Sequence, residues 1–495
     1  MSDDYSFLFD LLSIPNNGSY TLSNVDLSGP DKTLTIERPS SPTFCPACNS
    51  RMHSKGLYTR MISHPVFQDG SFLIIRLKQR RWRCPTCGLQ FNERFPFVER
   101  YKQFTNLTPI LVLDALKDLN ASTRSVARRF NMSDTQVHDL FTAYVDMKRL
   151  PLTEYISIDE VYLNIDPEHN YAFVIMDFTT GEIIDIVENR RQSTLEDYFH
   201  RIPLNERCIV KGIISDAYKP YMEYIPRFFP NASSILDSFH VMSFINHQLN
   251  IYLNDLIRSK REKLKKEWLR SHPHLGPRDF SPSDTKEIIL LRDYRWVLLK
   301  NERDINRSYR RYYHPKLKMN VDTSTIENMF FEIDPQLKRM HGLKEDYVSF
   351  NHMRFETEKE AAFALKILIQ KYRRSTMETF EKIAQFLEVH MYEIALSFTT
   401  LTVSRKSEDE SEKYYARLSN GPMESFNRKP KDYKRNARGA SNFDYTRNRI
   451  LWSERKDPAI RAVPKPMEQV HSYSLRKKTQ KQRSKTYNKK DKMEK

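Results

Sequence analysis

The chain has 495 residues, more than one hydrophobic core normally holds, so several domains are expected. It carries 80 Lys and Arg against 63 Asp and Glu, and the net charge of +17 favours nucleic acid over a membrane surface as partner. No apolar run is long enough to span a membrane, and the acidic N-terminus lacks the basic region of a signal peptide, so we expect a cytoplasmic protein.

The first hundred residues contain two Cys-x-x-Cys pairs. Residues 1–40 are polar and predict a loosely held N-terminal arm, and residues 41–100 predict a zinc ribbon. The four candidate zinc ligands are Cys45, Cys48, Cys84 and Cys87. Each pair places two thiolates close enough to share one tetrahedral ion, and four sulfurs leave no open position, so the zinc would be structural. Two unrelated pairs, or a redox motif, are the alternatives.

Arginines precede the second cysteine pair. Arg80, Arg81 and Arg83 lie in an extended, basic stretch that ends at the third cysteine. We expect these side chains to give the ribbon a basic face for contact with phosphates.

Residues 101–150 predict helices, and the segment STRSVARRFNMSDTQVHDLFTAYVD fits a helix-turn-helix. Ser122 and Ser133 are placed to cap its two helices. The residues expected to reach base edges are Thr135, Gln136 and His138. An ordinary helical hairpin is the alternative, and the basic chain with its preceding ribbon favours DNA binding.

Residues 151–245 alternate short β-branched runs with a helix, which predicts an α/β domain. Asp159 interrupts the run YISIDEVYL, where an aspartate opposes β propensity. Asp216 follows the run GIIS, at the strand end where open α/β sheets place ligands. A turn or cap role is the alternative for either aspartate, and Glu160, Asp177, Asp185 and Asp237 are competing acids of the same region.

Residues 246–410 predict an almost wholly helical segment, and residues 411–456 predict a further helical part that contains Glu424. Cationic and polar residues follow Glu424 at helical spacing and favour contact with DNA near a scissile phosphate; they are Asn427, Lys431, Lys434 and Arg435. Pro430 conflicts with one continuous helix, and a solvated charged helix is the alternative. Residues 457–495 predict a basic disordered tail.

These motifs together resemble bacterial insertion-sequence transposases of the IS-L-three type. The resemblance rests on the paired cysteines, the helix-turn-helix and the blocks ISIDEVY, GIISDAYKPY, LDSFHVMSFIN and NGPMESFNRKPKDYKRNARGASNFDYTRNRI. It implies an RNase H-like α/β catalytic domain interrupted by the helical segment as an insertion. It also implies an Asp-Asp-Glu triad of Asp159, Asp216 and Glu424 that holds two Mg²⁺ (or Mn²⁺) ions.

The resemblance implies a transposase that binds the terminal inverted repeats of its element and carries out strand cleavage and strand transfer. The expected partners are double-stranded DNA, as element ends and as target, and a second copy of the chain in a dimer or larger assembly. The bacterial nucleoid would be the place of action. A non-catalytic DNA-binding regulator derived from such an element is the alternative, and a structural nucleoid protein would need only the charge.

Overall fold

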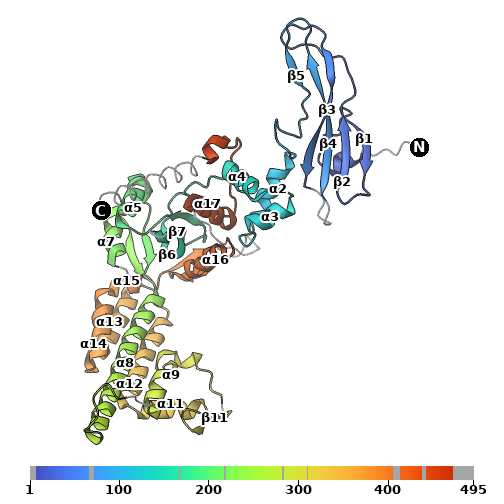
Figure 1. The fold of residues 1–495 in the computed structure, drawn as a ribbon. Coiled ribbons are helices and arrows are strands. Elements are labelled where there is room, and N and C mark those ends of the chain that lie inside the picture. The colour runs from blue at the N-terminus through green and yellow to red at the C-terminus, as the bar shows by residue number, and fades with distance from the viewer. Residues whose placement is uncertain are drawn as a thin grey trace, which may run out of the picture. The chain divides into compact units, whose positions relative to one another are not determined.

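The computed structural model describes residues 7–65, 72–166, 169–216, 219–280, 284–308, 310–404, 413–437 and 442–471 (Figure 1). The chain forms two compact units. Unit 1 comprises residues 1–149, 163–170 and 428–495, and unit 2 comprises residues 150–162 and 171–427. No described helix combines the length and apolarity that a bilayer crossing requires.

Unit 1 begins with a five-stranded sheet. Its elements are α1 (Phe7–Leu11), β1 (Thr21–Asp26), β2 (Lys32–Glu37), β3 (His53–His64), β4 (Leu73–Arg83) and β5 (Gln90–Asn92). The strand order is β1-β2-β4-β3, and β5 pairs with the end of β4. The long β3–β4 hairpin carries the two cysteine pairs at its ends, so the ribbon is built around this hairpin.

The described part of the expected N-terminal arm belongs to this sheet. β2 pairs in parallel with β4, from Lys32 opposite Leu73 onward, and Leu8, Phe9 and Leu12 are buried in the same core. This differs from the sequence expectation, because the segment is polar on average and its pairing partner lies about forty residues away. Its few apolar side chains are buried together with Thr33 and Thr35, and the burial of the apolar groups anchors the segment.

Helices of the second part of unit 1 form the helix-turn-helix. They are α2 (Leu107–Ala115), α3 (Thr123–Arg129) and α4 (Asp134–Tyr144). Ser122 caps α3 by accepting from the Ser125 amide at 3.1 Å, and Ser133 forms a capping box with Gln136 at the start of α4. Asn131 supplies the positive φ of the turn, which Asn tolerates better than most residues. The predicted helix-turn-helix is therefore present.

Helix α17 (Phe443–Glu454) packs on these helices, although more than 300 residues separate it from them in sequence. Arg449 is buried, and its guanidinium donates to the backbone carbonyls of Leu116 and Ala121. Trp452 donates to the carbonyl of Leu113 at 2.9 Å. These bonds satisfy carbonyls at the C-terminal end of α2 and just beyond it, so α17 completes the helical part of unit 1.

The start of the expected basic tail also lies in unit 1. Arg461 donates its backbone N–H to Tyr144 at 2.8 Å and pairs with Asp146, and Lys465 donates its N–H to Ala143 at 2.9 Å. These contacts hold the start of the expected tail against the C-terminal end of α4. The rest of the expected disordered tail, residues 472–495, lies outside the described residues.

Unit 2 contains a mixed α/β layer. Its strands are β6 (Tyr155–Asp166), β7 (His169–Asp177), β8 (Ile183–Val187), β9 (Gly212–Ser215) and β10 (Ser233–Leu236), in the order β10-β9-β6-β7-β8. β9 is parallel to both β10 and β6. Helices α5 (Gln192–His200) and α7 (Lys219–Phe228) bury Leu195, Phe199 and Phe228 against one face, and the four-residue α6 (Leu204–Arg207) precedes β9.

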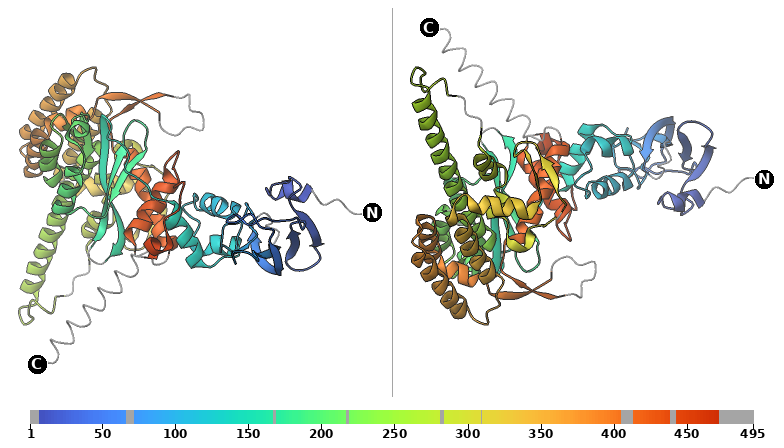
Figure 2. Two further views of the ribbon diagram at one scale, coloured as in Figure 1. Left: turned by 90° about the horizontal axis from the view of Figure 1, so that it is seen from above. Right: turned by 90° about the horizontal axis from the view of Figure 1, so that it is seen from below.

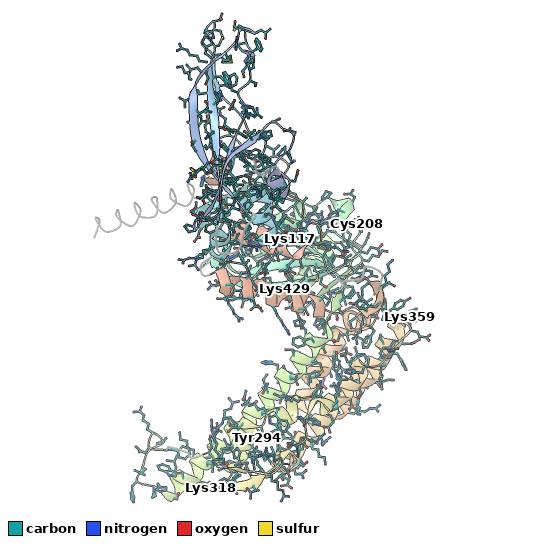
Figure 3. All side chains as sticks on the ribbon, turned by 90° about the vertical axis from the view of Figure 1, so that its right-hand side faces the viewer. Lys117, Cys208, Tyr294, Lys318, Lys359 and Lys429 are labelled. Carbon is teal, nitrogen blue, oxygen red and sulfur yellow. The ribbon has the colours of Figure 1, made fainter. Side chains whose placement is uncertain are left out.

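A helical segment lies between β10 and the last helix of unit 2. It contains α8 (Ser238–Ser271), α9 (Lys286–Asp293), α10 (Trp296–Leu299), a 3-10 turn (Glu302–Asp304), α11 (Thr323–Glu332), α12 (Pro335–Asn351), α13 (Glu358–Arg374), α14 (Glu378–Val389) and α15 (Met391–Leu396). Helices α8, α12, α13 and α14 run side by side around one apolar core (Figure 1). A short hairpin, β11 (Tyr312–His314) with β12 (Met319–Val321), carries Lys318 at the end of the segment away from Cys208 (Figure 3).

The chain returns to the sheet through a second hairpin. Strands β13 (Thr400–Val403) and β14 (Tyr414–Arg417) pair antiparallel, and Val403 and Leu418 pack on Ile214 of β9. This hairpin covers the sheet face opposite α5 and α7. It leads into α16 (Gly421–Ala437), which contains Pro430 and continues past it as one helix.

Candidate functional site

Asp159 lies on β6, and Asp216 directly follows the adjacent parallel strand β9. In β6 and β9 each residue lies opposite the residue 57 positions later, as Tyr155 opposite Gly212 and Ser157 opposite Ile214. Continuing this register by two residues places Asp159 opposite Asp216. Side chains two apart share a face, so both carboxylates lie on the face of Ser157 and Ile214, away from α5 and α7.

The surroundings of Asp159 disfavour a negative charge. Burial raises the pKa of Asp159 to about 6, and the Asp216 carboxylate adds to the rise. The Glu160 backbone N–H donates to Asp159 Oδ1 at 2.7 Å and opposes the rise without cancelling it. Two carboxylates held close together in a half-buried place favour the binding of a cation.

Helix α16 brings Glu424 and Asn427 to the same place. The two residues are three apart and therefore lie on one helix face. Asn427 Nδ2 donates to Asp159 Oδ2 at 2.8 Å, and its side chain is buried. The sequence predicts that Asn427 contacts DNA, whereas in the structure its amide holds the carboxylate of Asp159.

Asp237 and His240 stand beside Glu424. One ligand atom from each of these three residues lies within 4.8 Å of the other two. Asp237 is buried, and its two oxygens accept from the backbone N–H groups of Asn420, at 3.0 Å, and Phe239, at 3.1 Å. Asp237 therefore caps α8 and holds the chain just before α16, which fixes where Glu424 enters the site. His240 is half-buried, and its charge lowers the pKa of Asp159.

The competing acids of the same region have structural partners. Asp177 accepts from Thr153, Thr179 and Thr180 at the turn after β7. Asp185 accepts from the Tyr198 hydroxyl at 3.0 Å, and Glu160 pairs with Arg190 at 2.5 Å. These three acids are therefore engaged in structural contacts, whereas the fourth competing acid, Asp237, lies beside Glu424.

The four predicted cysteines converge in unit 1. Their sulfur atoms all lie within 4.8 Å of one another, with Cys45 to Cys87 at 3.5 Å and Cys48 to Cys84 at 3.4 Å. Each pair forms a tight turn that the N–H of the residue after its second cysteine closes, Asn49 on the Cys45 carbonyl and Gly88 on the Cys84 carbonyl. Both turn residues have positive φ, 56° and 73°. Hydrogen bonds from Ser50 lower the pKa of the Cys48 thiol to about 6, which favours a thiolate ligand.

The three ribbon arginines do not share one face. Arg81 and Arg83 are exposed on one side of β4, and the Arg81 guanidinium lies over the Tyr58 ring. Arg80 points to the other side, where its N–H and guanidinium meet the Glu93 carboxylate. The two-residue period of a strand explains the split. Arg81 and Arg83 are therefore the exposed arginines of this group.

The predicted base-contacting residues of α4 have different surroundings. Gln136 is exposed, and its Oε1 accepts from the Ser133 N–H at 2.9 Å. The His138 ring stacks on Tyr445 of α17, with ring centroids 4.4 Å apart. Thr135 is exposed and borders, with His138, a cleft of about 990 Å³ that Arg435 also lines. Within unit 1, α17 thus shapes the surroundings of the recognition helix.

The three cations predicted to contact DNA after Glu424, which are Lys431, Lys434 and Arg435, lie on the second half of α16. Lys431 and Arg435 are exposed, and Arg435 pairs with Asp432 at 3.0 Å. Lys434 is half-buried, and burial lowers its pKa. Pro430 does not end the helix before these residues, so all three belong to the helix that carries Glu424.

Two residues of this group, Asp237 and His240, have no role predicted from the sequence. They lie in the block LDSFHVMSFIN, and their contacts with Asn420 and Glu424 span about 180 residues, so no local signal indicates them. One clue was available: Asp237 follows a strand parallel to the one that Asp216 follows. Residues that follow the carboxyl ends of parallel neighbours gather at one edge of a sheet.

A helix-turn-helix joined to a carboxylate-bearing α/β layer is the plan of a DNA transposase, and the comparisons with known proteins agree. A family model described as a transposase of the DDE type matches residues 156–450, more than half of the chain. A second, described as the helix-turn-helix domain of transposase family ISL3, matches residues 93–145.

The chain belongs to the ISL3 family of transposases, the IS-L-three type that its motifs resemble. A transposase for insertion sequence element IS1001 from Bordetella parapertussis is 23% identical over 355 residues, which cover 70% of this chain and 80% of that relative. Membership implies DNA binding and DNA-cutting activity in general, and transposases of this type generally use divalent metals.

Proposed function

We propose that the protein binds the terminal inverted repeats of its insertion sequence and catalyses metal-dependent strand cleavage and strand transfer. The observation that carries the proposal is the hydrogen bond from Asn427, three residues after Glu424 on α16, to Asp159, whose pKa the Asp216 carboxylate raises. The family supports the reaction class, and the named residues are our assignment.

The architecture of unit 2 supports an RNase H-like catalytic fold with an insertion. Counted in chain order, its five strands have the spatial order 5-4-1-2-3, with the first, fourth and fifth parallel. The proposed carboxylates lie on the first strand, just after the fourth, and on the helix that follows the helical segment. We propose residues 246–410 as an insertion between the fifth strand and that helix.

The donor set fits two hard divalent ions. Mg²⁺ and Mn²⁺ prefer oxygen ligands, which the three carboxylates supply, and the raised pKa of Asp159 indicates a place where a cation relieves charge repulsion. Such ions, when bound, would activate water or a DNA 3′-hydroxyl and stabilise the departing 3′ oxygen. Asp159 would contribute to both metal sites, and Asp216 and Glu424 would each complete one.

The other residues of the site position these ligands. Asn427 holds Asp159 at one oxygen, and Asp237 holds the backbone ahead of Glu424. The exposed cations Lys431 and Arg435, with the half-buried Lys434, would contact phosphates of the bound strand.

The proposed DNA-end contacts come from unit 1. A structural Zn²⁺ held by the four cysteines would fix the ribbon, with Arg81 and Arg83 on phosphates and the helix-turn-helix at base edges. Since transposition joins two element ends, we propose that a dimer or larger assembly acts on double-stranded DNA in the bacterial nucleoid.

A nicking assay on DNA that carries an element end tests the proposal. We expect Asp159→Asn to abolish Mg²⁺-dependent cleavage, by at least about a hundredfold, while DNA affinity persists, because a metal ligand is lost and no DNA contact is removed. Asp197→Asn is the matched control, since Asp197 is exposed on α5 of the same unit.

Cleavage that survives in Asp159→Asn would overturn the assignment of the triad. Absence of cleavage in the unaltered protein, with end binding retained, would instead favour the non-catalytic regulator.

A further inference from the structure

A basic groove runs along α8 in the helical segment of unit 2, outside the proposed active site. It has a volume of about 420 Å³, and its cationic lining consists of Arg258, Arg261 and Lys265 from α8 with Arg292 and Arg295 from the α9–α10 region. Phe280 adds an apolar wall, and Glu262 is the acid of the lining. None of these residues belongs to the candidate site described above.

The α8 cations occupy one face of an exposed helix. Arg258, Arg261 and Lys265 are spaced by three and four residues, so they follow one another along the helix. Ile257 is the last buried side chain of α8, and the stretch from 258 to 271 carries seven Lys and Arg against two Glu. Figure 2 shows this far half of α8 extending beyond the neighbouring helices. The three cations on this face line the groove and can contact an external anion.

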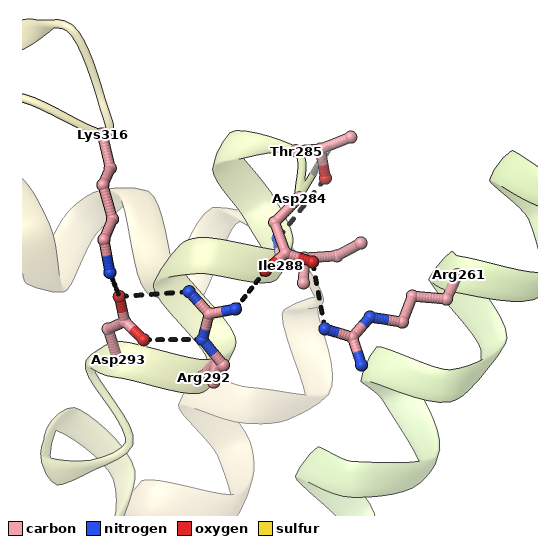
Figure 4. A network of polar contacts seen from close by, with 7 residues as sticks. All are labelled: Arg261, Asp284, Thr285, Ile288, Arg292, Asp293 and Lys316. Carbon is pink, nitrogen blue, oxygen red and sulfur yellow. Dashed lines mark hydrogen bonds and ion pairs between the residues drawn. The ribbon is translucent and has the colours of Figure 1, made fainter. Parts of the chain in front are cut away.

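A network of ion pairs holds two of the arginines in place. Asp284 accepts from Arg261 at 3.0 Å and also pairs with Arg292 (Figure 4). Arg292 continues to Asp293 at 2.7 Å, which Lys316 contacts at 2.9 Å. These bonds fix the groove wall, but they also neutralise part of its charge.

Arg258 pairs with Asp255, whereas two other cations of the groove have no such partner among the described residues. Arg295 donates to the neutral side-chain oxygens of Asn250, at 3.0 Å, and Asn254, at 2.7 Å. Among the described residues, neither Arg295 nor Lys265 has a carboxylate within ion-pair distance. An arginine oriented by amides, with its charge uncompensated, is suited to an anion that comes from another molecule.

We propose that this groove binds the phosphate backbone of double-stranded DNA beyond the segment held at the active site. The proposal rests on the proposed function, because it supplies the same substrate with a second contact. From Arg258 to Lys265 the helix rises by about 10 Å. That length corresponds to roughly three phosphates of one strand, at about 3.4 Å per phosphate along the axis. The cations of the groove match the regular spacing and the negative charge of a DNA phosphate backbone. Binding there would not depend on the base sequence.

Binding to a non-specific duplex, measured by fluorescence anisotropy without divalent metal over a range of salt, tests the proposal. We expect Arg258→Glu with Lys265→Glu to weaken binding by about tenfold and to lower the salt slope by about two, because two phosphate contacts are lost. The matched control is Lys263→Glu with Arg270→Glu, which changes the charge equally on the opposite face of α8. This control should retain most of the affinity.

Equal losses of DNA affinity in the two double variants would overturn the proposed binding site, because the change in net charge alone would then explain the weaker binding. If polyglutamate displaced the labelled duplex as strongly as unlabelled DNA does, the proposal of a DNA site would be overturned in favour of an acidic protein partner. Should the glutamate variants melt early, Arg258→Gln with Lys265→Gln provides the same comparison. The outcome is separable from the proposed function, since the assay needs no cleavage and Asp159→Asn should bind as the unaltered protein does.

Discussion

At the scale of single residues, Asp159 links the proposed chemistry to stability. Its pKa of about 6 lies above the ordinary value of 3.8 because burial and Asp216 disfavour the charged form. A carboxyl with a raised folded-state pKa contributes stability below the unfolded pKa, and this contribution is lost as the pH rises through the folded pKa. In the metal-free protein, the stability derived from this group should therefore fall between about pH 4 and pH 6.

The prediction is that Asp159→Asn raises the melting temperature of the metal-free protein by a few degrees at neutral pH. The neutral amide avoids the cost of a buried charge, and Asn427 can turn so that its Oδ1, which has no partner among the described residues, accepts from the new amide. The gain should vanish near pH 4, where the native carboxyl is protonated. Thermal melts at several pH values measure it, with Asp197→Asn as control. A gain independent of pH would contradict this account.

Several site residues could be predicted from their own surroundings, and others could not. An aspartate inside an apolar strand, as Asp159, or directly after one, as Asp216, is visible in a single sequence. The interaction of Asn427 with Asp159 spans 268 residues, so sequence spacing showed only that Asn427 shares a helix face with Glu424. In the folded protein Asn427 is buried and donates to Asp159, whereas the sequence predicts a contact with DNA.

At the scale of elements, α16 accepts a proline in its interior. Pro430 has no N–H, so the Phe426 carbonyl loses its bond within the helix, which ordinarily costs about 3 kcal/mol. Packing of the buried Pro430 and of its neighbours Phe426 and Tyr433 offsets this cost. Proline does remove one hydrogen bond from the interior of α16, as the sequence predicts. Tertiary packing nevertheless keeps the helix continuous past Pro430.

We predict that Pro430→Ala stabilises the protein by roughly 1–2 kcal/mol, because a helix bond is regained and only a small buried contact is lost. Pro422→Ala is the matched control. Pro422 lies in the first turn of α16, where proline is well tolerated, so its removal should change little. Chemical denaturation compares the two. An equal or lower stability of Pro430→Ala would show that the proline ring contributes more than the missing bond.

The elements differ in how far the sequence could predict them, and the reason is contact distance. The helix-turn-helix was predictable because its caps, at Ser122 and Ser133, and its turn act within a few residues. The pairing of β2 with β4 and the stacking of Tyr445 on His138 are contacts between distant segments. Such contacts depend on which surfaces meet in space, which local pattern does not encode.

At the scale of the whole molecule, the proposed metal sites are divided between the two units. The four cysteines lie in unit 1, whereas Asp159, Asp216 and Glu424 lie in unit 2. Compact units of one chain can unfold in separate cooperative transitions.

The prediction is that Cys48→Ser lowers one calorimetric transition and leaves another unchanged, because only unit 1 loses a zinc ligand. Cys208→Ser is the control, since Cys208 is the fifth cysteine and lies in unit 2 outside the cluster. Elemental analysis should find about one Zn²⁺ per chain in the control and much less in Cys48→Ser. A uniform shift of all transitions, or zinc retained without Cys48, would contradict the assignment.

Because α17 packs on the helix-turn-helix, this part of unit 1 can be completed only late in synthesis of the chain. The ribosome releases residues 107–144 early, but Arg449 and Trp452, which bond to carbonyls at the end of α2, emerge only after all of unit 2. Until then those carbonyls lack their partners and the apolar surface under α17 is open. A chain that ended before α17 would therefore lack the helix that completes this part of unit 1, and one that ended before Glu424 would also lack the proposed metal ligand.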